Sequence, residues 1–289
     1  MKIPFLDFGG GGPHLNFIHA NGYPPACYEP LLNLLTSHYH TFAMLLRPLW
    51  PGSNPAEIKD WYPLSDDFLE LLDQQQIDRS IAIGHSIGAI VALRAALNQP
   101  HRFRALVLIE PVLFPYYFIL EWNIARTFGL GRRFHPKIQG ANKRRREFDN
   151  LDQVFAGYRR RSIFRYFSDG NLRIFIRGMT RPKRSAAQEE PPVGGFELAY
   201  SPEWEVQIYY TGLWNDWDLW RGLPRLEIPT LILRGSETDT FWESTARSIR
   251  NRNPKIRIFT MDKSTHLLPL ERPQEVFNIT QTFLMDVLQ

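Results

Sequence analysis

Short apolar runs alternate with segments of helical spacing along most of the chain. The apolar runs, each expected to be a strand, are His14–Ala20, Thr41–Arg47, Arg79–Gly84, Ala105–Ile109, Pro229–Arg234 and Ile256–Thr260. The segments spaced as helices are Cys27–Ser37, Leu64–Gln75, Ile87–Leu97, Glu243–Arg250 and Pro273–Leu288. Strands of a parallel sheet that is covered on both faces are apolar throughout. The pattern therefore predicts an α/β fold built on a doubly wound, mostly parallel sheet.

The regular alternation stops after Ile109 and resumes near residue 223. Between these points the chain has short basic clusters separated by aromatic residues instead of strand patterns. An insertion into an otherwise regular α/β chain is expected to form a separate layer on the sheet. We therefore expect a core made of residues 1–111 and 223–289, and a mainly helical inserted cap at residues 112–222.

Composition narrows the class of protein. The chain has 289 residues, of which 44% are hydrophobic, and a single cysteine, so it can bury a large core and needs no internal disulfide. No apolar run approaches the roughly 20 residues of a membrane span, and none suits a signal peptide. These features predict a cytoplasmic protein without stable membrane insertion, and they leave the oligomeric state open.

The positive charge is concentrated in the insertion. Residues 116–200 contain 17 Lys and Arg against 8 Asp and Glu, a balance of +9, whereas the rest of the chain carries −5. No known nucleic-acid-binding module is visible, so we expect no nucleic-acid partner. A solvated basic surface is the favoured interpretation, and binding of an anionic substrate group or carrier is the alternative.

One motif carries a specific chemistry. Gly84-His85-Ser86-Ile87-Gly88 is a G-x-S-x-G sequence at the point where a predicted strand ends and a predicted helix begins. A serine at such a sharp turn is presented above the sheet edge, and the start of the helix supplies N–H groups for a developing oxyanion. Strand–turn–helix context is what this motif requires, so Ser86 is a candidate nucleophile.

A serine nucleophile needs a base, and the base needs an orienting acid. His266 follows the last predicted strand, and Glu237 and Asp239 follow the strand before it. Because sites gather at the carboxyl ends of strands in open α/β sheets, these side chains are expected to meet near Ser86. The histidines and the single cysteine show no metal-ligand spacing, so we expect no metal and no cofactor.

These segments resemble the α/β-hydrolase superfamily, specifically its cap-bearing serine hydrolase branch. The resemblance rests on Gly84–Gly88, on Leu231–Asp239, on Thr265–Pro273 and on Phe17–Pro24, and it fades in the insertion. It implies Ser86 as nucleophile, Asp239 as acid and His266 as base. Some relatives take the acid from the preceding strand, which leaves Glu110 as the alternative.

The resemblance also implies an oxyanion hole formed by the backbone N–H groups of Tyr23 and Ile87. Two extra residues, Ala20 and Asn21, precede the glycine that we align with the family glycine. Tyr210 and Trp214 of the insertion are candidates for binding the substrate.

The predicted function is hydrolysis of an ester-type bond (carboxylester, thioester or lactone) in a small-molecule acyl substrate, through a Ser-Asp-His triad and an acyl-enzyme. Epoxide hydrolases and haloalkane dehalogenases need an aspartate where this chain has Ser86. The alternatives are a carbon–carbon bond hydrolase of the same fold, or a receptor-like ligand-binding protein with little turnover.

Overall fold

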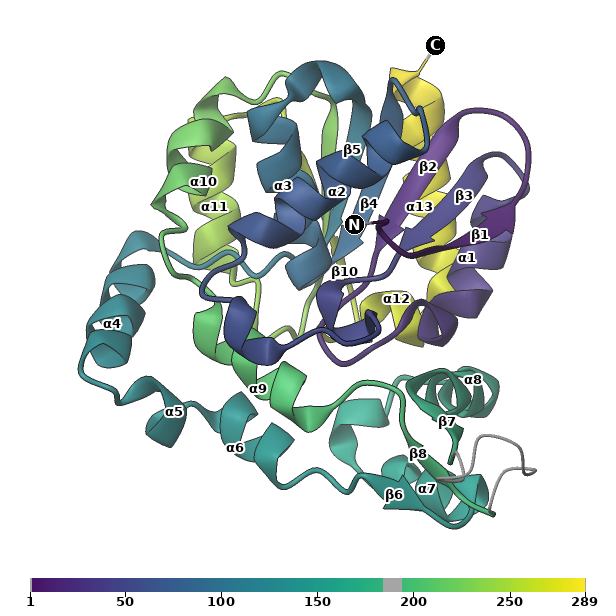
Figure 1. Ribbon diagram of the computed structural model, residues 1–289. Helices are drawn as coiled ribbons and strands as arrows, with labels where there is room; N and C mark the ends of the chain where they lie inside the picture. Colours follow the sequence, from purple (N-terminus) through teal and green to yellow (C-terminus); the bar gives the residue numbers. More distant parts are fainter. Residues whose placement is uncertain (1, 184–193, 289) are drawn as a thin grey trace.

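A seven-stranded sheet forms the centre of the computed structural model, which describes residues 2–183 and 194–288 (Figure 1). Its strands stand in the order β1-β3-β2-β4-β5-β9-β10, and every neighbouring pair is parallel except β1 with β3. The strands are β1 (Phe5–Gly9), β2 (His14–Ile18), β3 (His40–Met44), β4 (Ser80–His85), β5 (Phe103–Ile109), β9 (Thr230–Gly235) and β10 (Arg257–Met261). The predicted fold class is confirmed.

Helices cover both faces of this sheet, and each of the predicted helices is present with ends shifted by a few residues. The predicted helices correspond to α1 (Glu29–Leu35), α2 (Tyr62–Gln74), α3 (Ile87–Asn98), α11 (Glu243–Arg252) and α13 (Pro273–Val287). A short helix that was not predicted, α12 (Leu268–Glu271), precedes α13. Helices α1, α12 and α13 contribute to the hydrophobic core of one face, and α2, α3 and α11 to that of the other.

Alternation along the central strands explains why both faces are apolar. In β4, Ile81 and Ile83 pack with residues of α1 and α13, whereas Ala82 packs with residues of α2 and α3. Every residue of β4 is buried. A strand that is covered on both faces needs apolar side chains along its centre, here Ile81–Ile83, which produces the continuous apolar runs in the sequence.

The chain between β5 and β9 leaves the sheet and forms a second layer beside it (Figure 1). Its helices are α4 (Tyr116–Thr127), α5 (Gly131–Phe134), α6 (Pro136–Asn142), α7 (Leu151–Arg159), α8 (Asp169–Met179), α9 (Pro202–Thr211) and α10 (Trp217–Gly222). A small antiparallel sheet joins β6 (Glu147–Phe148), β8 (Phe196–Leu198) and β7 (Thr180–Pro182). The predicted helical insertion is therefore present, with this sheet added to it.

Residues 184–193, which belong to the predicted cap, lie outside the described part of the chain. Within the described ranges, no helix combines the length and the apolar character needed to cross a bilayer.

Candidate active site

Ser86 stands where strand β4 turns into helix α3. Its φ is +58°, a left-handed conformation that is unfavourable for a residue with a side chain, and its N–H donates to the carbonyl oxygen of Ile109 at 2.9 Å. A Cβ on Gly84 would lie 2.3 Å from the carbonyl oxygen of Gly88. A Cβ on Gly88 would lie 2.1 Å from that of Ile18. These close approaches are the physical reason for the two glycines that flank the serine.

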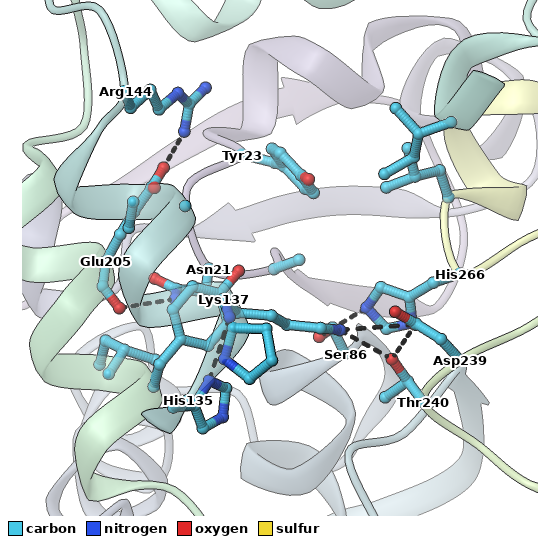
Figure 2. A pocket seen from close by; sticks show the side chains of 18 of the residues that line it. Asn21, Tyr23, Ser86, His135, Lys137, Arg144, Glu205, Asp239, Thr240 and His266 are labelled. Carbon is cyan, nitrogen blue, oxygen red and sulfur yellow. Dashed lines mark hydrogen bonds and ion pairs between the residues drawn. The ribbon is translucent and has the colours of Figure 1, made fainter. Parts of the chain in front are cut away.

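The hydroxyl of Ser86 meets the imidazole of His266. Ser86 Oγ lies 3.0 Å from His266 Nε2, and Figure 2 shows both side chains at the same cavity. His266 belongs to the loop between β10 and α12, and its carbonyl oxygen lies 2.8 Å from Nε2 of His85. His85 Nδ1 in turn lies 2.7 Å from the hydroxyl of Tyr28. His85 therefore holds the loop that carries His266.

The other imidazole nitrogen is bound by Glu110. His266 Nδ1 lies 3.1 Å from Glu110 Oε2, and the Glu110 side chain is completely buried. Glu110 directly follows β5, with a φ of +49°, and its N–H donates to the carbonyl oxygen of Leu233 on the neighbouring strand β9. Serine, imidazole and carboxylate thus form one hydrogen-bonded chain.

Asp239, the predicted acid, makes no hydrogen bond to His266 among the described residues. Asp239 lies in the loop after β9, where its side chain is 69% exposed. Its Oδ1 accepts a hydrogen bond from the Thr240 hydroxyl at 2.7 Å and pairs with Lys137 Nζ at 3.4 Å (Figure 2). Glu110, on the adjacent strand and buried beneath this loop, already occupies Nδ1. The alternative acid considered from the sequence is therefore the one in contact.

The hydrogen-bond donors around Glu110 are those expected around a carboxylate. Oε1 accepts the N–H of Gly235 at 2.6 Å, and Oε2 accepts the hydroxyl of Thr238. That hydroxyl already accepts the N–H groups of Thr240 and Phe241, at 3.1 and 3.3 Å, so its own proton points to Glu110. Both carboxylate oxygens therefore act as acceptors.

Burial controls the electrostatics of the pair. The pKa of His266 is lowered to about 3, mainly by burial and also by the nearby Lys137 ammonium, while Asp239 opposes the shift. Burial also raises the pKa of Glu110, against the hydrogen bonds from Thr238 and Gly235, which lower it. A neutral imidazole that donates Nδ1–H to Glu110 leaves Nε2 as an acceptor for the Ser86 hydroxyl proton.

The predicted oxyanion donor Tyr23 is engaged elsewhere. Its N–H donates to the carbonyl oxygen of Ala20 at 3.3 Å, which closes the turn after β2. The N–H of Ala20 donates to the hydroxyl of Tyr28 at 3.2 Å. Asn21, between these residues, lines the cavity next to Ser86, and within the described ranges its N–H has no hydrogen-bond acceptor. In this turn the N–H of Tyr23 is therefore used within the backbone, whereas that of Asn21 is not.

Ile87 retains its predicted position. It is the first residue of α3, where a backbone N–H has no partner within the helix, and it lines the same cavity. An N–H at the start of a helix also benefits from the positive end of the helix dipole.

A cavity of about 1500 Å³ opens above Ser86 and His266. The inserted segment supplies most of its wall, including Phe118 and Trp122 of α4, Lys137 of α6 and Tyr209 of α9. A space of this size with a few polar groups beside a buried nucleophile is typical of a small-molecule site.

The structure does not place the predicted substrate-binding residues Tyr210 and Trp214 in this wall. Their rings instead flank the Arg126 guanidinium, with centroids 5.0 and 4.3 Å from its central carbon. Tyr209, one position before Tyr210 on α9, faces the cavity. Adjacent helical residues point about 100° apart, so a one-residue difference changes the face.

Comparisons with known proteins agree with this fold. A family model described as "Alpha/beta hydrolase family" matches residues 17–279. The chain is 23% identical over 281 residues to a pimeloyl-[acyl-carrier protein] methyl ester esterase from Aeromonas salmonicida, covering 95% of this chain and 96% of the relative. The crystal structure of E-2-(acetamidomethylene)succinate hydrolase superposes with a TM-score of 0.76 at 19% identity, covering 97% of this chain and 94% of the other.

A more similar relative is matched over a shorter part. An epoxide hydrolase from Caballeronia sordidicola is 33% identical over 101 residues, which is 33% of this chain. The match spans only 30% of the length of that relative.

Proposed function

Because the chain belongs to the alpha/beta hydrolase family, we propose that it is a serine hydrolase that cleaves an ester-type bond through an acyl-enzyme. The observation that carries the proposal is the hydrogen-bonded chain from Ser86 through His266 to the buried Glu110, next to a large cavity. On the basis of these hydrogen bonds, we propose a triad of Ser86, His266 and Glu110 in place of the predicted triad of Ser86, Asp239 and His266. Carboxylesters, thioesters and lactones are the substrate classes we consider.

The proposed reaction proceeds in two steps. His266 Nε2 takes the proton of the Ser86 hydroxyl while Oγ attacks the substrate carbonyl carbon. The tetrahedral intermediate collapses, the bond to the leaving alcohol or thiol breaks, and Nε2 returns the proton to that leaving group. Water then attacks the acyl-enzyme in the same way and releases the acid and free Ser86. Glu110, whose two oxygens both accept hydrogen bonds, stabilises as a carboxylate the imidazolium that forms in each step.

We propose the backbone N–H groups of Asn21 and Ile87 as the oxyanion donors. Ile87 begins helix α3, and Asn21 is the residue of the turn after β2 whose N–H is available at the cavity. Donors that are fixed in the backbone stabilise the developing charge without reorganisation.

We assign residues 1–111 and 223–289 to the catalytic core and 112–222 to the cap. Support for this division comes from the cavity, whose wall the inserted segment largely provides while the core carries the nucleophile. The cap is therefore the part that selects the substrate. The residue at the turn between β4 and α3 is Ser86. We therefore do not assign to this chain the activity named for the epoxide hydrolase that it resembles.

The pH profile follows from the buried base. His266 must be neutral to accept a proton, and a lowered pKa means that it stays neutral at lower pH. We expect kcat/KM for a neutral ester to remain constant as the pH falls from 8 and to decline only below 6.5, the ordinary value for histidine. An acidic inflection at or above 6.5, measured in steady-state assays from pH 4 to 9, would contradict the proposed environment of His266.

A fluorophosphonate probe tests the proposal most directly, because it reacts with activated serines and needs no knowledge of the substrate. We expect stoichiometric labelling at Ser86, located by peptide mass spectrometry, and loss of hydrolysis of a panel of esters, thioesters and lactones in proportion. A panel of vinylogous diketones distinguishes the carbon–carbon hydrolase alternative. Absence of labelling, together with tight binding of a small molecule in the cavity, would instead support the receptor-like alternative.

A further inference from the structure

Lys137 is a cap cation that lies beside the catalytic groups. It lies on α6, and Figure 2 shows its side chain extending into the cavity toward Ser86 and His266. Its Nζ lies 3.1 Å from the Thr240 hydroxyl and 3.4 Å from Asp239 Oδ1. Among the described residues these two oxygens are its hydrogen-bond partners. A lysine ammonium has three N–H donors, so one remains for a group in the cavity.

Two arginines of the cavity wall are committed to protein partners. Arg144 pairs with Glu205, whose side chain is buried, and Arg165 pairs with Glu237, which also accepts the hydroxyl of Tyr166. Each of these arginines is therefore already paired with a carboxylate.

The partner of Lys137 is held less tightly. Asp239 is largely exposed to solvent and accepts a second hydrogen bond from Thr240, so it needs no lysine to be satisfied. A long pair between exposed groups contributes little to stability and exchanges readily with another anion. Lys137 can therefore bind a new anion at little cost to the fold.

We propose that Lys137 binds a carboxylate carried by the substrate, so that the protein prefers carboxylate-bearing esters or thioesters over neutral ones. The proposal rests on the proposed serine hydrolase function and names its substrate class. A single negative charge suits this position because Asp239 lies beside the ammonium. A phosphate monoester, with a charge between −1.5 and −2 at neutral pH, would be repelled more strongly.

The position of Lys137 also affects the chemistry. An ammonium near His266 disfavours the imidazolium that forms in the transition state, and Lys137 lowers the pKa of His266 for this reason. A substrate carboxylate paired with Lys137 would offset that repulsion. An anionic substrate should therefore have a higher kcat as well as a lower KM than its neutral counterpart.

The test compares two esters that differ only in charge. Monomethyl glutarate carries a carboxylate where methyl 5-oxohexanoate carries a methyl ketone. We expect the wild type to prefer the anion, and Lys137→Met to lower the ratio of the two kcat/KM values by about 10- to 100-fold, the range for a hydrogen bond to a charged group. Lys137→Arg should retain part of the preference. Monomethyl succinate, monomethyl adipate and O-butyryl glycolate vary the distance and the side of the ester that bears the charge.

Arg160→Met is the control, because it removes one positive charge from an exposed position of the cap that does not line the cavity. The ratio should change by less than about twofold in this variant, since a distant exposed charge is screened by solvent. If both variants lost the preference for the anionic ester equally, the preference would come from the overall positive charge of the cap. That result would overturn the proposal. An unchanged ratio in Lys137→Met for every anionic ester would overturn it as well.

A binding measurement separates this proposal from the proposed function. In the Ser86→Ala background, calorimetric titration with monomethyl glutarate should give a Kd that the added Lys137→Met raises about tenfold or more. Equal Kd values would overturn the carboxylate site even in an active hydrolase. The opposite result is a Kd that depends on Lys137 together with hydrolysis that does not need Ser86, or with no hydrolysis at all. That result would overturn the hydrolase function and leave the binding site in place.

Discussion

Replacement of Ser86 by alanine is expected to lower kcat by about 10⁴-fold or more on any true substrate. The hydroxyl is the group that His266 contacts at 3.0 Å, and alanine offers no atom that could form the acyl-enzyme. What remains is the stabilisation that the backbone N–H groups and the cavity provide to a direct attack by water. Steady-state rates with the best ester or thioester of the panel, together with loss of fluorophosphonate labelling, measure the effect.

Ser162→Ala is the control for this substitution. Ser162 also lines the cavity, but its side chain is exposed and lies in the cap. Hydrolysis should change by less than about twofold, within the range of a neutral surface substitution. A clean Ser86→Ala preparation that retains wild-type turnover would exclude the proposed nucleophile, and equal losses in both variants would indicate a general defect of the cavity.

The core could be predicted from the sequence because its local and tertiary signals agree. The central stretches of strands β4 and β5 are buried, so Ile81–Gly84 and Ala105–Ile109 had to be apolar. The turn at Ser86 had to be flanked by glycines because backbone carbonyls lie within 2.4 Å of where their side chains would begin. Such requirements are local, and they are visible in a single sequence.

The acid could not be assigned because it depends on which side chain crosses between two strands. Both Glu110 and Asp239 follow strands that end at the same edge, and β5 and β9 are direct neighbours. A strand pattern places both residues near His266 but does not determine the direction of either side chain. One signal was available: Glu110 is a carboxylate that directly follows the apolar run Ala105–Ile109.

The cap was the least predictable part, because its contacts are long-range. Helix α9 places Tyr209 rather than Tyr210 at the cavity, a choice of helix face that depends on packing against α6. Lys137 was one cation among many in a basic segment until the fold brought α6 to the loop after β9. Charge counted along the chain located the cap but not the individual residue that meets the site.

Replacement of Glu110 by glutamine, a side chain of nearly the same size, is expected to lower kcat by about 10³- to 10⁴-fold. The carboxylate accepts Nδ1–H and so keeps Nε2 free to accept the Ser86 proton. A glutamine can present its NH₂ group to Nδ1 instead, which favours the tautomer with the proton on Nε2. That tautomer cannot act as a base toward Ser86, and the neutral amide cannot stabilise the imidazolium. Steady-state kcat and the rate of fluorophosphonate labelling should fall together.

Asp239→Asn is the matched isosteric control, and it distinguishes the two acids. Asp239 is exposed and touches Lys137 and Thr240 rather than the imidazole, so kcat for a neutral ester should fall by less than about tenfold. Thermal unfolding of both variants shows whether either loss reflects a damaged fold, which matters because Glu110 also accepts the N–H of Gly235. If Asp239→Asn lost activity by 10³-fold or more while Glu110→Gln stayed folded and active, the loop after β9 would supply the acid during turnover. The buried carboxylate would then be an anchor for that loop rather than part of the catalytic chain.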